Sequence, residues 1–441
     1  MHARAHHRPR IVVVGAGFAG YQAARRLLRR SRGAADVVVV NPTDYFLYLP
    51  LLPEVAGGVI DPRAISVPLQ DTLPGVRLVL GEVDGVDTAA RTVSYAGPEG
   101  ERGTLGYHRL VLAAGSVNKL LPIPGVAENA HGFRGIPEAL YLRDHLVRQV
   151  ELADETDDPA ERAARMTFVV VGAGYTGTEV TAQGQLLTAD IAARHPRLRG
   201  TPPRWLLLDT ADQVLPGMHA RMSEAAERVL RGRGIDVHLG TSVREATADG
   251  VRLTDDRFVP SRTLVWCVGV RPDPLVEQAG LPTDEGRLRV DAHLNVPGHP
   301  EIFGCGDGAA VPDLHRPARY TALTAQHAIR QGRLVADNIA ASYGIGQPRR
   351  YRHRDLGFVV DLGGWQAAAD PLHVPLSGPL ARAVTRGYHL AALPANRLRT
   401  ATDWLITAVS ARPGVQLGLV EGQAVPLDTG APQVPAAQRS G

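Results

Sequence analysis

Two glycine-rich loops carry the chemistry that this sequence predicts. The string GAGFAG at 15–20 follows an apolar run, and the string GAGYTG at 172–177 follows another. A G-x-G-x-x-G loop turns the backbone sharply and brings a pyrophosphate to the start of the next helix, where free amide hydrogens favour an anion. We therefore predict two dinucleotide-binding sites. Their glycines are Gly15, Gly17 and Gly20 in the first loop and Gly172, Gly174 and Gly177 in the second.

The residue that ends the second strand of each unit indicates which nucleotide binds there. Asp209 has that position in the second unit. A carboxylate there accepts both ribose hydroxyls and repels a 2′-phosphate, which favours NADH over NADPH. An exposed acid that merely follows a strand is the alternative interpretation. Asn41 has the equivalent position in the first unit, where its amide bonds a hydroxyl but lacks the doubly accepting carboxylate.

The segments around the loops predict the elements that hold them. Four consecutive apolar residues precede each loop, which is typical of a strand buried on both faces of a parallel sheet. The unit of strand, glycine loop, helix and second strand therefore occurs twice. We predict an α/β fold with two Rossmann-like dinucleotide-binding domains and a smaller C-terminal region with amphipathic helices. The expected strands are 11–14, 37–40, 168–171 and 206–208, and the expected helices are 21–30, 179–191 and 321–341.

The order of these units divides the chain into predicted domains. The first nucleotide-binding domain is discontinuous and comprises 9–118 and 290–345, and the second comprises 119–289. A C-terminal domain spans 346–428. The polar, Pro-bearing tail at 429–441 is predicted to be disordered.

The composition excludes several classes of protein. With 44% hydrophobic and 21% charged residues among 441, the chain can form several cores and is not a disordered protein. The formal net charge of +3 is too small to favour a nucleic-acid partner. No apolar stretch reaches the roughly 18 to 20 residues that cross a bilayer, so we predict a cytoplasmic location. Cys267 and Cys305 lie far apart, so we expect buried structural thiols, no disulfide framework and no metal site.

Seven strings occur in a specific order and spacing. They are IVVVGAGFAG (11–20), YFLYLPLLPEVAGG (45–58), LVLAAGS (110–116), FVVVGAGYTGTEV (168–180), LVWCVGVRP (264–272), IFGCGDGA (302–309) and AQHAIRQG (325–332). Together they resemble the two-dinucleotide-fold flavoprotein oxidoreductases and, within them, the type II, non-proton-pumping NADH:quinone oxidoreductases. The resemblance covers about residues 10–410.

This resemblance implies that FAD binds the first unit and that NADH binds the second as a substrate. It places Asp307 at the ribityl chain or its nearby phosphate, while a helix N-cap is the structural alternative. It also places Ala114 and Gly115 beside the flavin and Pro50 and Leu51 near its ring. The residues implied for FAD are Gly15, Gly17, Gly20, Asn41, Pro50, Leu51, Ala114, Gly115 and Asp307, and those implied for NADH are Gly172, Gly174, Gly177, Asp209 and Gly269.

The resemblance implies that Glu179 and the string at 325–332 take part in electron and proton transfer. Glu179 follows the third glycine of the NADH loop by two residues. It would orient the nicotinamide or relay a proton to the reduced acceptor, and an ordinary acid in a first helical turn is the alternative. Gln326 and Gln331 match the quinone motif of the family, A-Q-x-A-x-Q-Q, but Arg330 replaces a glutamine. The resemblance thus implies Glu179 and Gln326 as catalytic residues, and Gln326, Arg330 and Gln331 as quinone contacts.

The segment 395–412 bears on whether the protein meets a membrane. Leu398, Leu405 and Val409 fall on one face at helical spacing, and Trp404 is expected at an interface. Such a helix can lie on a bilayer, or pack on the protein or on a second subunit of a homodimer. The resemblance favours peripheral attachment to the inner face of the cell membrane.

We expect a ping-pong reaction in which NADH reduces FAD, NAD leaves, and a quinone takes up two electrons and two protons. One alternative is a soluble NADH-dependent reductase of a ferredoxin-like protein or a small acceptor. Another is an NADH-sensing flavoprotein with negligible turnover.

Overall fold

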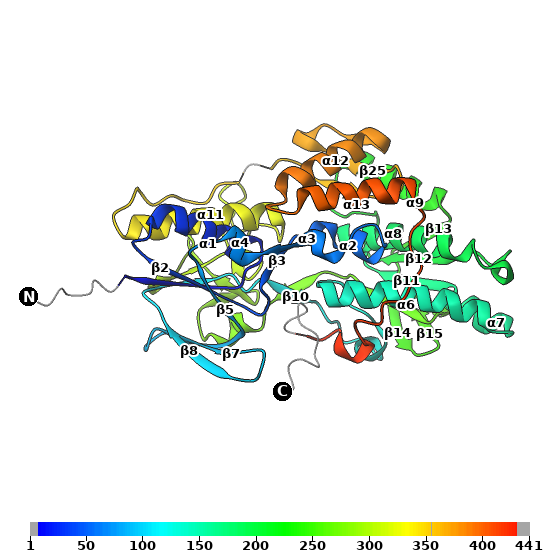
Figure 1. Ribbon diagram of the computed structural model, residues 1–441, viewed down its shortest axis with the longest axis horizontal. Coiled ribbons are helices and arrows are strands. Elements are labelled where there is room, and N and C mark those ends of the chain that lie inside the picture. Colours follow the sequence, from blue (N-terminus) through cyan, green and yellow to red (C-terminus); the bar gives the residue numbers. More distant parts are fainter. Residues whose placement is uncertain (1–7, 354, 430–441) are drawn as a thin grey trace, which may run out of the picture.

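The computed structural model describes residues 8–353 and 355–429. Two parallel β-sheets form two halves of the molecule, and helices cover their faces (Figure 1). A third, smaller group of C-terminal elements lies along one side. The structure confirms the predicted α/β class with two Rossmann-like units and a smaller C-terminal region.

The first sheet is built around the strand that precedes the first glycine loop. In spatial order its strands are β21 (Asn295–Val296), β22 (His299–Gly304), β9 (Arg109–Leu112), β1 (Arg10–Val14), β2 (Asp36–Asn41) and β5 (Arg77–Leu80). All neighbours run parallel except β21 and β22. Helices α1 (Phe18–Ser31) and α11 (Ala325–Ser342) pack against each other in this half (blue and yellow in Figure 1).

The second sheet repeats the plan with four parallel strands. In spatial order they are β13 (Ile235–Leu239), β12 (Arg204–Asp209), β11 (Thr167–Val171) and β17 (Thr263–Trp266). Helix α8 (Tyr175–Ala192) follows the second glycine loop, and α6 (Ile136–Glu155) packs against it. Helix α9 (Ala220–Gly232) packs on β13.

The buried apolar runs explain why both sheets are parallel. Val12 and Val13 in β1 and Val169 and Val170 in β11 are all 0% exposed. A strand that is apolar on both faces must be covered on both faces, and strand–helix–strand crossovers supply that cover. Each half also carries a three-stranded antiparallel sheet. These are β6 (Glu82–Asp87), β7 (Thr92–Ala96) and β8 (Arg102–Gly106), and β14 (Val243–Thr247), β15 (Gly250–Leu253) and β16 (Phe258–Pro260).

Short elements join the two halves. Strand β10 (Ser116–Asn118) leaves the first sheet and pairs antiparallel with β18 (Val270–Pro272), which leaves the second.

Other short strands before the C-terminal region are β3 (Tyr45–Leu47), β4 (Ser66–Pro68), β19 (Thr283–Asp284), β20 (Arg287–Arg289) and β23 (Ala309–Ala310). The short helices include η1 (Leu49–Leu51), α2 (Leu52–Ala56), α3 (Pro62–Ile65), α4 (Leu69–Thr72), α5 (Val126–Asn129) and α10 (Leu275–Gln278).

One segment differs from its sequence interpretation. The polar composition of 154–165 indicates a connection, but the structure forms helix α7 (Pro159–Arg165) there. The Asp158 carboxylate accepts a hydrogen bond from the Ala160 amide, and Pro159 stands at the first helical position. An N-cap acid followed by proline is a strong helix start. A polar composition therefore does not exclude a helix where an N-cap acid and a proline begin it.

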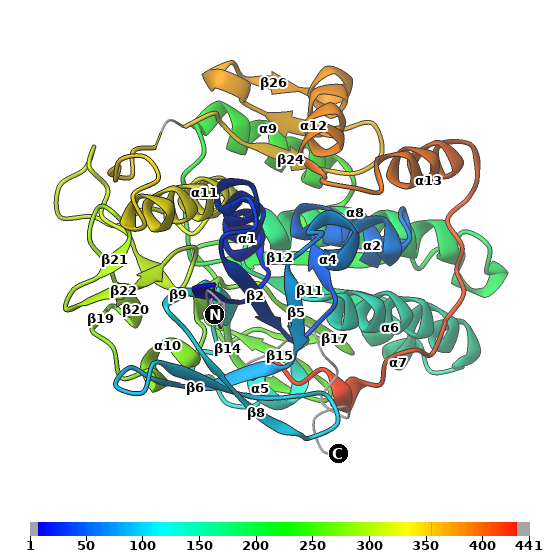
Figure 2. The same ribbon diagram turned by 60° about the vertical axis from the view of Figure 1, so that its left-hand side comes forward.

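The C-terminal elements lie above α8 and α2 (Figure 2). Strands β24 (Val359–Asp361), β25 (Ala367–Ala369) and β26 (Leu376–Ser377) form an antiparallel sheet, and α12 (Gly378–Ala392) packs on it. Helix α13 (Arg397–Val409) follows and contacts α3. In the part of the chain that the structure describes, no helix has the length and apolar character to cross a membrane. The tail predicted to be disordered, 429–441, lies outside the described residues except for Thr429.

Candidate active site

The first glycine loop packs two of its glycines tightly and leaves the middle one free. The backbone at Gly15 has φ +88°, and a Cβ there would lie 2.5 Å from the carbonyl oxygen of Ala113. A Cβ at Gly20 would lie 1.9 Å from the carbonyl oxygen of Gly15. At Gly17, by contrast, a Cβ would meet no protein atom within 4 Å. The open side of Gly17, at the N-terminus of α1, is therefore free for a ligand.

The second loop has the same geometry. A Cβ at Gly172, where φ is +104°, would lie 2.2 Å from the carbonyl oxygen of Cys267. A Cβ at Gly177 would lie 1.8 Å from the carbonyl oxygen of Gly172, and one at Gly174 would meet nothing within 4 Å. Both loops thus present an open backbone at the start of a helix, which suits a pyrophosphate.

The residues that end β2 and β12 both hold the adjacent glycine loop. The Asn41 carboxamide oxygen accepts a hydrogen bond of 2.7 Å from the Ala16 amide, and its nitrogen donates to the Thr43 carbonyl. In the second unit, Asp209 Oδ2 accepts from the Ala173 amide at 2.5 Å and Oδ1 accepts from the Ala211 amide at 2.8 Å. Asp209 is partly exposed, so its carboxylate can also reach a ligand.

The structure brings together the loops that follow β9 and β22. Ala114 and Gly115 come directly after β9, and Gly115 has φ +80° with open space where a Cβ would stand. Asp307 lies in the loop after β22, and its Oδ2 accepts a hydrogen bond of 2.7 Å from the Ser116 hydroxyl. The same hydroxyl accepts a bond from Arg134. The segments expected beside the flavin therefore meet at the carboxyl ends of their strands.

Three further residues predicted to face a nucleotide lie in short connections. Pro50 and Leu51 belong to η1, where Leu51 is 1% exposed and Pro50 is half-buried. Gly269 lies between β17 and β18 with φ +106° and open space beside it. Like Gly17, Gly115 and Gly174, it offers backbone that a ligand can approach closely.

The glutamines of α11 have different surroundings. Gln331 is 1% exposed, accepts a hydrogen bond from the Gly306 amide at 2.8 Å and donates to the Thr321 hydroxyl at 3.0 Å. Its side chain holds the loop that carries Asp307. Gln326 lies at the N-terminal end of α11, and its side-chain nitrogen donates to the Gly357 carbonyl at 2.6 Å.

Arg330, the residue that departs from the glutamine motif, lies one turn further along α11. It donates to Gln326 Oε1 at 3.1 Å and contacts His353 Nδ1 at 3.2 Å. Both Gln326 and Arg330 are only half-buried. These two residues can therefore meet an acceptor directly, whereas Gln331 supports the site from behind.

Glu179 lies in α8, in the second turn after the glycine loop. Its Oε1 accepts a hydrogen bond of 2.9 Å from the backbone amide of Asp361. Burial raises the pKa of Glu179 well above its ordinary value. The hydrogen bond from the Asp361 amide opposes this rise, and the charges of Asp361 and Glu54 add to it. Glu179 thus holds a proton more strongly than a surface glutamate does.

Glu54 and Asp361 were not among the predicted site residues, although both are buried near Glu179. Glu54 is 3% exposed and Asp361 is 6% exposed. Glu54 interrupts the apolar string PLLPEVA, and Asp361 ends the apolar strand β24. The sequence feature that indicates such residues is a lone acid within an apolar run, because a buried carboxyl requires a partner or a role.

Trp404 is buried, contrary to the interface position expected for it. It is 5% exposed, and its indole nitrogen donates a hydrogen bond to Glu54 Oε2. The face of α13 that carries Leu398, Leu405 and Val409 is exposed instead, with 82%, 66% and 79% exposure respectively. The indole therefore anchors α13 to α2, and the apolar face points outward.

Both cysteines are free thiols. Cys305 is 0% exposed, and Cys267 is partly exposed. Burial raises the pKa of each thiol to about 12, so neither forms the thiolate that attacks a substrate at neutral pH. Within 8–353 and 355–429, no cluster of histidine, cysteine or acidic side chains could hold a metal ion.

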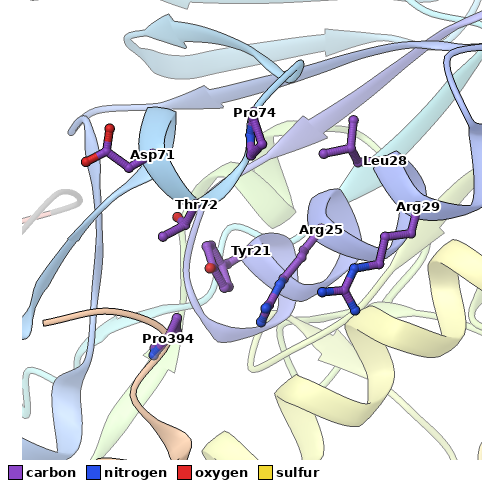
Figure 3. Close-up of a pocket in the computed structure, with 8 residues that line it drawn as sticks. All are labelled: Tyr21, Arg25, Leu28, Arg29, Asp71, Thr72, Pro74 and Pro394. Carbon is purple, nitrogen blue, oxygen red and sulfur yellow. The ribbon is translucent and has the colours of Figure 1, made fainter. Parts of the chain in front are cut away.

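A cavity of about 360 Å³ lies beside α1 (Figure 3). Arg25 and Arg29 line one side of it, and Asp71, Thr72 and Pro74 line another. None of the predicted site residues borders this cavity. The candidate site is therefore formed by the loops at the carboxyl ends of the strands in the two sheets, and not by this cavity.

Comparisons with known proteins give the family and the fold. A family model described as pyridine nucleotide-disulphide oxidoreductase matches residues 9–332. The chain is 32% identical over 435 residues to the type II NADH:quinone oxidoreductase Ndh of Mycobacterium tuberculosis, covering 95% of this chain and 91% of that one. It is 30% identical over 410 residues to the demethylphylloquinone reductase NdbB of Synechocystis, covering 90% and 96%. Its fold is similar to that of NDH2 from Plasmodium falciparum, solved in complex with NADH, with a TM-score of 0.84, 18% identity and coverage of 92% and 100%.

Proposed function

The chain belongs to the pyridine nucleotide-disulphide oxidoreductases and, within them, to the type II NADH:quinone oxidoreductases, and we propose how its own residues carry out that reaction. It is an NADH dehydrogenase that uses a flavin to pass electrons from NADH to a quinone. The observation that supports the residue assignment is the duplicated glycine loop. Each of the two loops has an open middle glycine at the start of a helix.

We assign FAD to the first unit. The open backbone at Gly17 suits a pyrophosphate, so a dinucleotide fits this unit better than a mononucleotide does. Asp307, held by Ser116, faces the ribityl chain or its phosphate, and Gly115 leaves room for the flavin. When bound, the flavin accepts a hydride and releases two electrons, while the protein supplies position and electrostatics.

We assign NADH to the second unit. Gly174 offers its open backbone to the pyrophosphate, and Gly269 leaves room near the nicotinamide end. The Asp209 carboxylate accepts hydrogen bonds from the ribose hydroxyls and repels a 2′-phosphate. Glu179 orients the nicotinamide or holds a proton for the acceptor.

We assign the quinone to the N-terminal end of α11. Gln326 and Arg330 are half-buried there and carry polar groups that can donate to a quinone carbonyl. Gln331 contributes by holding the Gly306 amide. Arg330 replaces a neutral amide with a permanent cation, which favours the negative charge that develops on a quinone oxygen during reduction.

Anaerobic stopped-flow absorbance of the FAD-loaded protein tests this assignment. NADH should bleach the flavin rapidly, and a short-chain menaquinone analogue should then restore its colour at a catalytic rate. Bleaching without recolouring would refute quinone reduction and favour a protein acceptor. If every acceptor recolours the flavin slowly, an NADH sensor is the better interpretation.

We further propose that α13 attaches the protein to the inner face of the cell membrane. Its outward face carries the exposed apolar side chains of Leu398, Leu405 and Val409, and burying them in a bilayer would remove this apolar surface from water. A membrane there would bring the enzyme to a lipid-soluble quinone, and a second subunit covering the same face would instead give a homodimer.

Co-sedimentation with phospholipid vesicles separates the two arrangements. A double substitution, Leu398→Asp with Leu405→Asp, should abolish vesicle binding without lowering Tm, because both side chains are exposed. Ile345→Asp is the matched control, since Ile345 is 43% exposed but lies outside α13. Unchanged vesicle binding by the double variant would refute attachment through α13, and a loss of dimer in its sedimentation profile would assign this face to a subunit contact.

A further inference from the structure

Three acids far apart in sequence lie together beside α8. Glu54 comes from α2, Glu179 from α8 and Asp361 from the end of β24. A Cβ at Gly57 would lie 2.8 Å from the Cβ of Gln183, so α2 and α8 approach as closely as a glycine permits. Glu54 precedes Gly57 by about one turn, and Glu179 precedes Gln183 by one turn. The two glutamates therefore belong to helices that contact each other, and the charge of Glu54 acts on Glu179.

Asp361 positions Glu179, and its charge acts on both glutamates. Its backbone amide donates the 2.9 Å hydrogen bond to Glu179 Oε1, and the Gly363 amide donates to Asp361 Oδ1 at 2.6 Å. Burial raises the pKa of Glu54 to about 8, and the charge of Asp361 adds to this effect. The charge of Asp361 also raises the pKa of Glu179. The pKa values of both glutamates are therefore raised.

Several charged groups from the surrounding elements act on this cluster. Arg382 and Arg386 on α12 lower the pKa of Glu54, as does its hydrogen bond from Trp404 on α13. Because these effects are smaller than that of burial, the protonated form still prevails at neutral pH. The other charged or titratable groups that interact with Glu54 or Asp361 are Arg233, His389 and Arg412.

A second cavity lies near this cluster, because Trp404, whose indole donates a hydrogen bond to Glu54, lines it. It has a volume of about 160 Å³ and lies between α8, α12 and α13. A cavity of this size has room for several water molecules. Its lining includes Gln183, Asp190, Arg382, Arg386, Trp404 and Arg412.

The lining of the cavity is suited to water. Nε and one terminal nitrogen of Arg382, and Nε of Arg386, are buried without a hydrogen-bond partner among the described residues. Buried donors of this kind are normally satisfied by ordered water. Trp404 lines the cavity and donates to Glu54, so Glu54 lies directly behind the cavity wall. Asp190, with its side chain 48% exposed, marks the outer end.

On the basis of the function proposed above, we propose that Glu54 is the outer member of a proton path that leads from this cavity to Glu179. NADH gives up a hydride, which carries two electrons and one proton, and the quinone needs two electrons and two protons. One proton per turnover must therefore come from solvent. Glu179 gives that proton to a quinone oxygen, Glu54 replaces it, and water in the cavity reprotonates Glu54. Asp361 is a positioning residue, because its amide holds Glu179.

The test compares Glu54→Gln, which cannot release a carboxyl proton, with Glu54→Asp, which can. Glu301→Gln is the matched control, because Glu301 is also buried, at 8% exposed, but belongs to β22. In stopped-flow experiments on the FAD-loaded enzyme, all variants should be reduced by NADH within about twofold of wild type. Reoxidation by quinone should slow about 100-fold in Glu54→Gln, as expected when a proton donor is lost. It should slow much less in Glu54→Asp and not at all in Glu301→Gln.

A second measurement does not depend on turnover. The infrared C=O band of protonated carboxylic acids, followed during a pH titration of the resting holoenzyme, should lose in Glu54→Gln a component that titrates near pH 8 in wild type. Glu301→Gln should retain that component. A band that is the same in wild type and Glu54→Gln would overturn the assignment of a stored proton to Glu54.

The outcomes separate this inference from the proposed function. If quinone fails to reoxidise the wild-type enzyme, the proposed function is wrong. If the wild type is reoxidised and Glu54→Gln is equally fast, the function stands and the proton path is overturned. If Glu54→Gln does not fold, the infrared titration of Glu54→Asp decides: a shift of the component that titrates near pH 8 in wild type supports the assignment of the proton to Glu54, and an unchanged component overturns it.

Discussion

Replacing Gly174 and Gly177 separately by alanine distinguishes ligand contact from packing within one loop. The two glycines are three residues apart, but their surroundings are opposite. A Cβ at Gly174 meets no protein atom within 4 Å, whereas a Cβ at Gly177 would lie 1.8 Å from the carbonyl oxygen of Gly172. The first methyl group therefore enters the space intended for the nucleotide, and the second collides with the loop itself.

The expected effect of Gly174→Ala on stability is small. Gly174 has φ −70° and ψ −172°, a conformation that alanine adopts without strain. A glycine-to-alanine change at such a position alters the free energy of unfolding by about 1 kcal/mol or less. The effect on NADH should be large, because the methyl group keeps the pyrophosphate away from the helix N-terminus. Loss of one charge-assisted hydrogen bond, about 1.5–3 kcal/mol, corresponds to a rise in the KM for NADH of about 10- to 100-fold.

Gly177→Ala should destabilise the fold. A carbon and a carbonyl oxygen approach to about 3.3–3.6 Å even in a weak hydrogen bond, so the loop must shift by more than 1 Å to relieve the 1.8 Å contact. Overpacking of this kind costs about 1–3 kcal/mol or more. Tm should therefore fall clearly in Gly177→Ala and remain close to wild type in Gly174→Ala.

Thermal melting, flavin absorbance and NADH kinetics together make the assay. Gly174→Ala should keep its Tm and its flavin while NADH binds weakly. An unchanged KM for NADH in a folded Gly174→Ala protein would refute the assignment of this loop to the pyrophosphate. A wild-type Tm in Gly177→Ala would refute the packing argument. Gly17→Ala and Gly20→Ala repeat the comparison in the first unit, with flavin retention as the measurement.

Three further predictions concern acidic residues. Asp209→Asn should weaken the preference for NADH over NADPH, measured as the ratio of their kcat/KM values, and an unchanged ratio would remove Asp209 from the ribose site. Glu179→Gln should lower kcat while the protein keeps its flavin, and full activity would leave Glu179 a structural residue. The pKa of Glu54 is about 8 in the folded protein against an ordinary 4.5, so folded wild type loses stability as pH rises through that interval. Glu54→Gln should therefore gain Tm over wild type progressively from pH 5 to pH 8, and a constant difference would contradict the raised pKa.

Local sequence pattern predicted the elements that hold the two loops. The expected strand 11–14 is β1 (Arg10–Val14), and the expected strand 206–208 is β12 (Arg204–Asp209). The expected helix 21–30 begins three residues earlier in the structure, as α1 (Phe18–Ser31), because the glycine loop already forms the first turn. Apolar runs and glycine spacing are properties of neighbouring residues, which explains why they can be read without the fold.

The surroundings of individual side chains could not be predicted in this way. Gln331 matches a motif for acceptor contact, yet the fold buries it against the Gly306 amide. Trp404 falls on an amphipathic helix, yet its indole bonds Glu54, which is 350 residues away in sequence. Each of these contacts depends on how two distant elements pack. Periodicity gives the face of a helix but not the residue that meets it.

The duplicated unit shows how one position can serve two purposes. Asn41 and Asp209 both accept a hydrogen bond from an amide of the adjacent glycine loop, so both fix the shape of that loop. A carboxylate has about four acceptor positions, and the protein uses one on each oxygen of Asp209. The remaining positions can accept two ribose hydroxyls at once. Asn41 has only one oxygen, and its nitrogen already donates to Thr43. We therefore propose that Asp209 discriminates between nucleotides by its charge and by two hydroxyl contacts, as a site for an exchanging substrate requires, whereas the amide of Asn41 can offer no such charge.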